Sequence, residues 1–323
     1  KYIISSKLWS GHKRRKRYHK KKGNGFGYGL FDFNQLSLLI IHFKKVGINI
    51  YLILHSTTNP NDDDSKNMFD LKNSFQLCNR VFVHTIKDLN RLKDYGLIDN
   101  VTLFPHGFLD LKSNSKNIIS RLTKSLRKYC SYQIGTYGFC LPNKGFKELI
   151  LACDILIKRG FNLKLNLYSA VYSEDYLWVF EQLKNLIIEL NLQESICIDT
   201  TYMNDRQTLR VLSKMDFLVF PYQFTAESSS ASVRHGIASN QNVLVTPSPI
   251  FDDVSRLVNY LPGFTSKEIA DGIEQWLSKS NYKSQKDYEK SLHREKLISE
   301  RRFTNLSFKL ISMIKSLESN LNL

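Results

Sequence analysis

The sequence lacks long apolar runs, because stretches such as SLLII at 37–41 are far shorter than the roughly 20 residues of a membrane-spanning helix. It also lacks a C-x-x-C pair, and its five cysteines are scattered along the chain. An odd number of scattered thiols is typical of a reduced protein rather than a secreted disulfide framework. We find no signal peptide and expect a cytoplasmic protein without a transmembrane segment.

The sequence also lacks histidine pairs with metal-ligand spacing such as H-x-x-x-H. Three histidines instead follow apolar runs singly: His55 after IYLIL, His84 after RVFV and His106 after LFP. A single histidine at a strand end is more often a hydrogen-bonded structural residue than a ligand. We therefore expect no protein-bound metal and no other cofactor, and we expect the acidic run Asp62–Asp64 to be solvated.

Acidic residues are fewer than basic ones, 30 against 46, which gives a formal net charge of +16. Eight of the basic residues lie in HKRRKRYHKKK at 12–22, which runs into GNGFGYG ending at residue 29. A basic run beside Gly-aromatic sequence favours phosphate contacts and base stacking, which makes nucleic acid a candidate partner. The alternatives are a solvated loop or an attachment to an anionic membrane surface.

The second half of the chain alternates short apolar runs with amphipathic stretches. The pattern predicts strands at 132–138, 163–169, 195–200, 216–222 and 242–247, and helices at 145–160, 175–190, 205–215 and from about Ser228. Such alternation indicates a parallel sheet with helices on both faces. We assign residues 109–283 to a Rossmann-like domain of the α/β class and 284–323 to a helical tail.

The first half, residues 1–108, shows the same alternation of apolar runs and amphipathic stretches less completely. It predicts helices at 34–46 and 86–96 and strands at 48–56, 79–85 and 101–107. A full Rossmann-like domain holds about twice that number of strands. We therefore expect a partial N-terminal domain, facing the second domain across a ligand-binding cleft.

Two motifs place charged groups at predicted strand ends. In LPNKG, 141–145, Lys144 precedes a helix whose free N-H groups favour an anion. In PYQFTAESSSASVRHG, 221–236, a helix starting near Ser228 would place Glu227 and Arg234 on one face. This arrangement suits a sugar diphosphate. In the first motif, the alternative is that Lys144 is simply exposed at a helix start. In the second, the alternative is that Ser228–Ser230 cap the helix while Glu227 and Arg234 form a salt bridge on its surface.

The order of these motifs resembles the GT-B glycosyltransferases of family 4. IGTYGFCLPNKGFKELI matches their lysine turn, MDFLVFPYQFTAESSSASVRHGIASNQNVLVTPSP matches their E-x7-E region, and HTIKDLNRLKDYGLIDNVTLFPHGFLD matches the end of their first domain. The likeness covers roughly residues 48–280. It implies a GT-B fold of two Rossmann-like domains that face a cleft, here with an incomplete N-terminal domain.

The resemblance also implies roles for single residues. Lys144 corresponds to the family lysine on the donor diphosphate, Glu227 to the first glutamate of E-x7-E, and His55 to a histidine that faces the sugar. Two positions depart: Phe139 replaces an arginine, and His235 replaces the second glutamate. The predicted catalytic residues are Glu227, Lys144, Arg234 and His55, and the predicted donor-binding residues are Gly138, Lys144, Ser228, Ser229, Ser230 and His235.

The implied reaction is sugar transfer from a nucleotide-sugar donor to a glycan or lipid-linked acceptor in polysaccharide biosynthesis. The resemblance implies retention of configuration and no metal, with Arg234 offsetting the charge that Phe139 removes. A membrane-linked acceptor would place the enzyme peripherally on the inner membrane face. The alternatives are a catalytically silent scaffold of this fold, or a nucleic-acid or membrane binder acting through residues 12–22.

Overall fold

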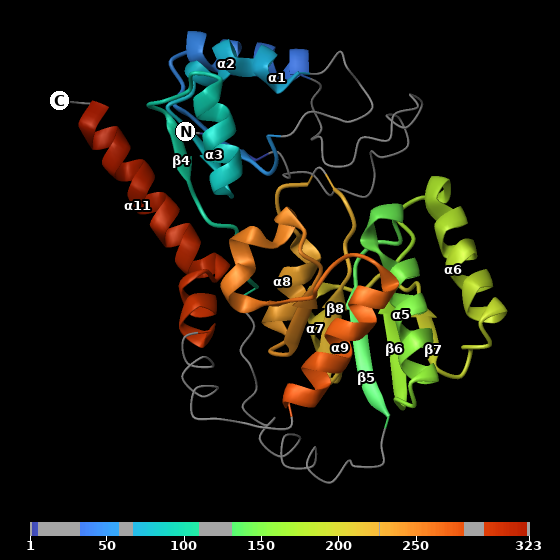
Figure 1. Cartoon of the computed structure of the whole chain (residues 1–323). Coiled ribbons are helices and arrows are strands. Elements are labelled where there is room, and N and C mark those ends of the chain that lie inside the picture. Colours follow the sequence, from blue (N-terminus) through green and yellow to red (C-terminus); the bar gives the residue numbers. More distant parts are fainter. Residues whose placement is uncertain are drawn as a thin grey trace. The chain divides into compact units, whose positions relative to one another are not determined.

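The computed structural model describes residues 2–5, 33–57, 67–109, 131–225, 227–280 and 294–321 (Figure 1). They form two compact units: Lys1–His106 with Thr225–Ser230, and Gly107–Phe224 with Ala231–Leu323. The basic segment 12–29 and the acidic run Asp62–Asp64 lie outside the described residues. Among the helices that the structure describes, none combines the length and hydropathy of a membrane crossing.

The first unit contains a four-stranded parallel sheet in the order β1-β2-β3-β4. Its elements are β1 (Tyr2–Ser5), α1 (Phe33–Lys45), β2 (Ile50–Leu54), the 3-10 helix η2 (Met68–Leu71), α2 (Lys72–Gln76), β3 (Arg80–Val83), α3 (Ile86–Asp94) and β4 (Val101–Leu103). Strands β2, β3 and β4 confirm the three predicted strands, whereas β1 was not predicted. Its four residues carry no alternation that distinguishes them from a loop.

The core of the first unit lies around β2 and β3. Ile50, Val81 and Val83 are fully buried, and they pack with Ile40 of α1 and Phe75 of α2. Apolar residues at successive strand positions are typical of parallel strands, which are covered on both faces. The parallel arrangement also brings the carboxyl ends of β2, β3 and β4 to one edge of the sheet.

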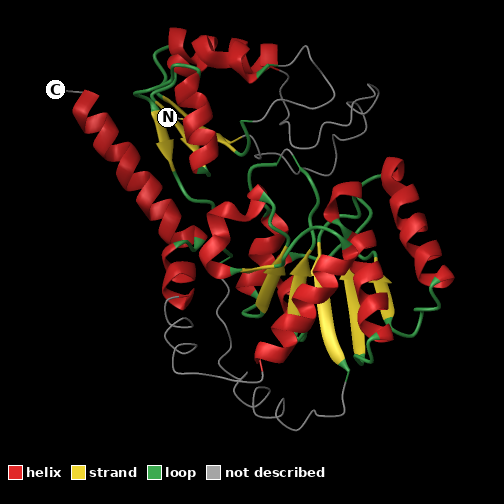
Figure 2. Cartoon of the chain, viewed as in Figure 1, coloured by secondary structure: helices red, strands yellow, loops and turns green. Residues whose placement is uncertain are grey.

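The second unit contains a six-stranded parallel sheet in the order β10-β9-β8-β5-β6-β7. Strands are drawn in yellow and helices in red in Figure 2. The strands are β5 (Tyr132–Tyr137), β6 (Leu163–Tyr168), β7 (Ile196–Asp199), β8 (Phe217–Phe220), β9 (Asn242–Val245) and β10 (Asn259–Tyr260). The helices are η5 (Pro142–Lys144), α5 (Phe146–Lys158), η6 (Glu174–Tyr176), α6 (Leu177–Glu189), α7 (Asp205–Leu212), α8 (Ala231–Ala238), η7 (Pro249–Leu257), α9 (Ser266–Ser280) and α11 (Phe303–Leu321). Strands β5 to β9 confirm the five strands predicted for the second half of the chain.

The start of one helix in the second unit differs from the prediction. Helix α8 begins at Ala231 rather than near Ser228. Ser228, Ser229 and Ser230 all suit the position before a helix, so composition could not single out the residue at which α8 begins.

The C-terminal segment is part of the second unit, because the Phe108 N-H donates to the Arg301 carbonyl (2.8 Å) and the Phe303 N-H donates to the Phe108 carbonyl (2.9 Å).

The cysteines of the described residues divide into protected and accessible thiols. Burial raises the pKa of Cys78 and Cys153 to about 12, and it also raises that of Cys140. Cys197 is exposed on β7. Since the thiolate is the reactive form, we expect iodoacetamide to label Cys197 in the native protein and to label Cys78 and Cys153 only after unfolding. Peptide mapping by mass spectrometry checks this, and native labelling of Cys153 would contradict it.

Candidate functional site

The turn that follows β5 is built around a glycine. Gly145 has a φ of +70°, and a Cβ at this position would lie 1.8 Å from the Pro221 carbonyl oxygen. Only glycine combines this left-handed conformation with such a close approach. The Gln223 N-H also donates to the Asn143 carbonyl (3.0 Å). The β5–α5 turn is therefore held directly against the chain leaving β8.

This turn fixes the position of Lys144. The Lys144 Nζ lies 4.0 Å from the ring centroid of Tyr222, a cation–π contact. A Cβ at Gly138 would lie 3.1 Å from the Ser232 hydroxyl and 3.8 Å from the Tyr222 hydroxyl. Tyr222 thus connects the ammonium of Lys144 on one side with Gly138 on the other, and Ser232 of α8 lies against Gly138. Such a cluster can bind an anion such as a diphosphate.

Next to this cluster is a shallow, mostly apolar pocket in the second unit. The pocket is partly open to solvent, and its lining consists of Tyr137, Gly138, Phe139, Tyr168, Ala170, Thr201, Tyr202, Met203 and Ser232. Both tyrosine hydroxyls are neutral near pH 7, and burial raises the pKa of Tyr137 and of Tyr168 further above the ordinary value. Aromatic side chains with neutral hydroxyls suit a planar heterocycle that both stacks and forms hydrogen bonds.

His235 lies beside this pocket. Its Nδ1 donates to the Ala231 carbonyl (3.0 Å), and its Nε2 lies 2.9 Å from the Asp205 carboxylate. The ring centroid is 5.1 Å from that of Tyr137, which lines the pocket. Helix α7 holds Asp205 in place through a capping box between Asn204 and Gln207.

Arg234 faces the interior of the second unit. Its side chain is 3% exposed and forms an ion pair with Asp253 of η7, which is 7% exposed. Burial lowers the pKa of the Arg234 guanidinium, and the attraction of Asp253 opposes that shift. The expectation that Glu227 and Arg234 share one face of a helix is wrong, because α8 begins after Glu227. The predicted role of Arg234 at a donor phosphate stays a prediction.

Glu227 and the three serines belong to the first unit. The Ser228 hydroxyl lies 2.8 Å from the Asp88 carboxylate and 3.3 Å from the Ser56 hydroxyl. Asp88 is 1% exposed and also accepts hydrogen bonds from the Thr57 N-H (3.2 Å) and hydroxyl (2.6 Å). A buried carboxylate that sequence reasoning missed therefore anchors the loop Thr225–Ser230.

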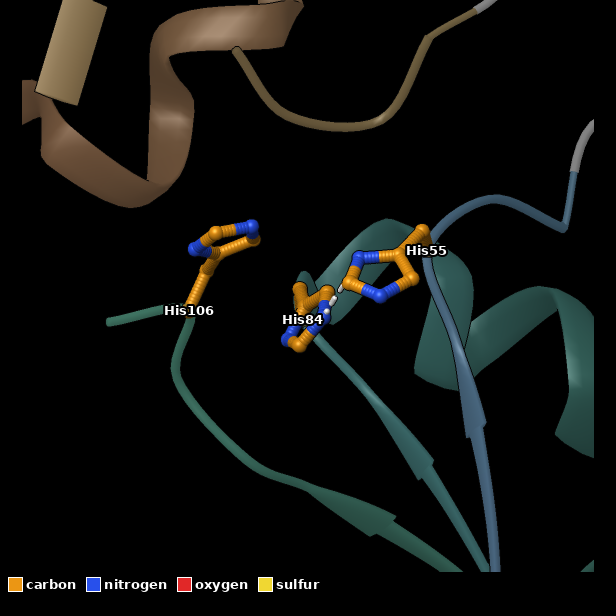
Figure 3. A group of neighbouring side chains, drawn as sticks. All are labelled: His55, His84 and His106. Carbon is orange, nitrogen blue, oxygen red and sulfur yellow. Dashed lines mark hydrogen bonds between the residues drawn. The ribbon is translucent and has the colours of Figure 1, made fainter. Parts of the chain in front are cut away.

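His55 lies in the first unit next to two other histidines. Its Nδ1 is 3.1 Å from the Nε2 of His84, and its ring centroid is 5.6 Å from that of His106 (Figure 3). The two units thus separate the predicted site residues into two groups. Gly138, Lys144, Arg234 and His235 lie in the second unit, while His55, Glu227, Ser228, Ser229 and Ser230 lie in the first. The cleft predicted for both groups stays a prediction.

Solved structures of similar fold include a glycosyltransferase and a trehalose-phosphate synthase. The HepE protein (Alr3699) of Anabaena, in complex with UDP and glucose, has a TM-score of 0.67 at 14% identity, covering 88% of this chain and 76% of that one. The UDP-forming α,α-trehalose-phosphate synthase of Burkholderia vietnamiensis has a TM-score of 0.70 at 11% identity, covering 90% and 72%. A glycosyltransferase of Rickettsia africae has a TM-score of 0.65 at 14% identity, covering 89% and 82%. The chain has the GT-B fold.

Sequence comparisons give a different and shorter match. No family model matches the chain. A stretch of 62 residues, 19% of the chain, is 48% identical to the Type II methyltransferase M1.ScrFI of Lactococcus lactis subsp. cremoris. A stretch of the same length is 42% identical to M.SsoII of Shigella sonnei. In each case the chain spans only 16% of the methyltransferase.

Proposed function

We propose that the chain is a glycosyltransferase that moves a sugar from a nucleotide-sugar donor to a glycan or lipid-linked acceptor. The observation that carries this proposal is the cluster of Gly138, Lys144, Tyr222 and Ser232 beside an aromatic pocket, in one unit of a GT-B fold. The HepE protein, which shares this fold, is solved with UDP and glucose. A uridine diphosphate is therefore the first donor nucleotide to test.

In this proposal the pocket binds the base of the donor. Tyr202 is 66% exposed and Phe139 is 36% exposed, and the base is proposed to stack on these two rings of the pocket lining. The neutral hydroxyls of Tyr137 and Tyr168 supply hydrogen bonds to ring oxygens or nitrogens. Phe139, which replaces an arginine in the family pattern, then contributes apolar surface to the pocket instead of charge.

The diphosphate is proposed to lie against Lys144 and the first turn of α8. During transfer the bond between the anomeric carbon and the phosphate oxygen breaks, and negative charge develops on the leaving diphosphate. Lys144 stabilises this charge electrostatically, and no metal is required for that step. The contact with Tyr222 holds the ammonium in place before the donor binds. The lysine therefore needs little reorganisation during the reaction.

Retention of configuration belongs to the same proposal and comes from the family resemblance. The acceptor hydroxyl forms the new bond to the anomeric carbon, and its proton passes to the leaving diphosphate. No protein nucleophile is assigned. Glu227 and His55 are proposed to position the sugar. Nuclear magnetic resonance of the product's anomeric proton tests the stereochemistry, and inversion would overturn this part.

Replacement of Lys144 by alanine tests the donor site. We expect UDP binding to weaken by about 1.5–3 kcal/mol, or roughly 10- to 150-fold, because a charge-assisted hydrogen bond is lost. Isothermal titration calorimetry measures this effect, with GDP and ADP as alternative nucleotides. The control is Lys158→Ala, because Lys158 lies at the other end of α5 and pairs with Asp154 (2.7 Å).

The controls separate three outcomes. An equal loss in Lys144→Ala and Lys158→Ala would indicate attraction by general surface charge and contradict the site. No binding of any nucleotide would favour the silent scaffold. Binding followed by release of nucleoside diphosphate from the nucleotide sugar supports the enzyme.

A further inference from the structure

Three histidines of the first unit converge on a single small space (Figure 3). Their candidate ligand nitrogens, one each from His55, His84 and His106, all lie within 4.8 Å of one another. His84 and His106 are buried, at 7% and 9% exposure, and His55 is half-buried. Among the residues that the structure describes, this is the one group of three or more His, Cys, Asp or Glu side chains with metal-site geometry.

The sheet topology explains why the histidines meet. His55 directly follows β2, His84 directly follows β3, and His106 comes three residues after β4. These strands are parallel neighbours, so their carboxyl ends lie side by side. Residues separated by 29 and 22 positions in the sequence therefore become neighbours in space. Spacings such as H-x-x-x-H, which place two ligands on one helix, therefore do not predict such a group.

A hydrogen bond to the ring of His84 determines which of its two nitrogens can bind a cation. The Nδ1 of His84 lies 2.9 Å from the Phe104 carbonyl oxygen. A carbonyl only accepts hydrogen bonds, so this Nδ1 carries the proton and the Nε2 of neutral His84 presents a lone pair. Anchoring of the second ring nitrogen by a carbonyl is the usual arrangement of metal-binding histidines. The His84 ring is thus already oriented as a ligand.

One pair of nitrogens already has the spacing of a tetrahedral site. With metal–nitrogen bonds of 2.0–2.1 Å, two ligand nitrogens in such a site lie about 3.3 Å apart. The Nε2 of His84 and the Nδ1 of His55 are 3.1 Å apart. All three candidate nitrogens lie within 4.8 Å of one another, so the widest pair must close by up to about 1.5 Å to reach this spacing. A cation here would replace the hydrogen bond between His84 and His55.

We propose that His55, His84 and His106 form a binding site for one divalent transition-metal cation of the zinc class. Three neutral imidazoles favour zinc, cobalt, nickel or copper over magnesium and calcium, which prefer oxygen ligands. Three protein ligands leave a fourth position for water or another molecule. This proposal goes beyond the proposed function and replaces the expectation of no protein-bound metal, which rested on spacing in the sequence.

Metal titration of the full chain tests the site. The protein is first dialysed against a chelator and then titrated with Zn²⁺ in a calorimeter. Titration with Co²⁺ reports the coordination number through its visible absorption. We expect one Zn²⁺ per chain, the intense absorption of four-coordinate Co²⁺, and a rise in the melting temperature with Zn²⁺. No stoichiometric binding, or binding only of six-coordinate Co²⁺, would overturn the proposal.

Variants identify the ligands. We expect His84→Ala and His106→Gln each to weaken Zn²⁺ binding at least about 100-fold, since even the partners of ligands contribute 10- to 100-fold. His42→Ala is the matched control, because His42 is exposed on α1 of the same unit. A double change of His12 and His19 to alanine controls for the basic segment.

Circular dichroism and thermal unfolding without metal show whether each variant is folded. If His84→Ala is unfolded, His106→Gln and His55→Gln carry the test. Binding that survives these ligand changes, or that is lost equally in His42→Ala, would overturn the proposal. Failure of this test leaves UDP binding by the second unit intact, whereas failure of the Lys144 test leaves Zn²⁺ binding intact. The two proposals are therefore distinguishable.

Discussion

Replacement of Arg234 by methionine is expected to lower the free energy of unfolding by about 3–5 kcal/mol, the usual cost of removing one partner from a buried ion pair. The reason is that Asp253, 7% exposed, would keep a buried carboxylate without the guanidinium that pairs with it, while the attraction of Arg301 would remain. Chemical denaturation monitored by circular dichroism measures the change.

Two comparisons make this prediction specific. In the double variant Arg234→Met/Asp253→Leu both charges are absent, and we expect most of the lost stability to return. Arg159→Met removes a more exposed arginine, which pairs with Asp271 and Glu274 at 2.8 and 2.6 Å, and we expect a much smaller loss. A double variant less stable than Arg234→Met would contradict the account.

The same double variant tests whether Arg234 contacts the donor. A loss of UDP binding in Arg234→Met alone would be ambiguous, because the variant is destabilised. In the double variant the fold is expected to recover while the guanidinium stays absent. Retained UDP binding would then assign Arg234 to the structure of the second unit, and a loss of roughly 10- to 150-fold would support its predicted role at the phosphates.

Replacement of Gly145 by alanine is expected to cost at least about 3 kcal/mol of stability and to weaken UDP binding as well. The left-handed conformation alone costs an alanine about 1–2 kcal/mol. The added Cβ also lies 1.8 Å from the Pro221 carbonyl oxygen, so the β5–α5 turn must move away from the end of β8. That movement displaces Lys144, the preceding residue. Denaturation and calorimetry measure the two effects.

Gly160→Ala is the matched control for this prediction. Gly160 has a φ of +89° at the end of α5, and no atom lies within 4 Å of the position that a Cβ would occupy there. We expect a loss of about 1–2 kcal/mol from the backbone conformation and no effect on UDP binding. If both alanine variants lose the same stability, contact with Pro221 does not explain the glycine at 145.

The fold of the second unit was largely predictable from the sequence. Strands β5 to β9 are apolar runs separated by amphipathic helices, a pattern that local side-chain periodicity is sufficient to predict. Strand β10 was not predicted, because its two residues are too few to show a period. The start of α8 was placed too early, because Ser228, Ser229 and Ser230 are all suitable capping residues.

The site was predictable only in part. Lys144 of LPNKG and Gly138 were identified from the sequence, and the structure connects them through Tyr222, whereas the role of Gly145 became evident only from its contact with Pro221. The pairing of Arg234 with Asp253 depends on the packing of η7 against α8, which local sequence does not specify. The meeting of His55, His84 and His106 depends in the same way on strand order.

The contact between Ser228 and Asp88 has a consequence for synthesis of the protein on the ribosome. The two residues are 140 positions apart in the sequence, yet they belong to the same compact unit. At 5–20 residues per second, Ser228 is made roughly 7–28 s after Asp88. Until then the first unit lacks the loop Thr225–Ser230, so it cannot complete its folding before the second unit begins to be made. The nascent first unit therefore remains incomplete until most of the second has been translated.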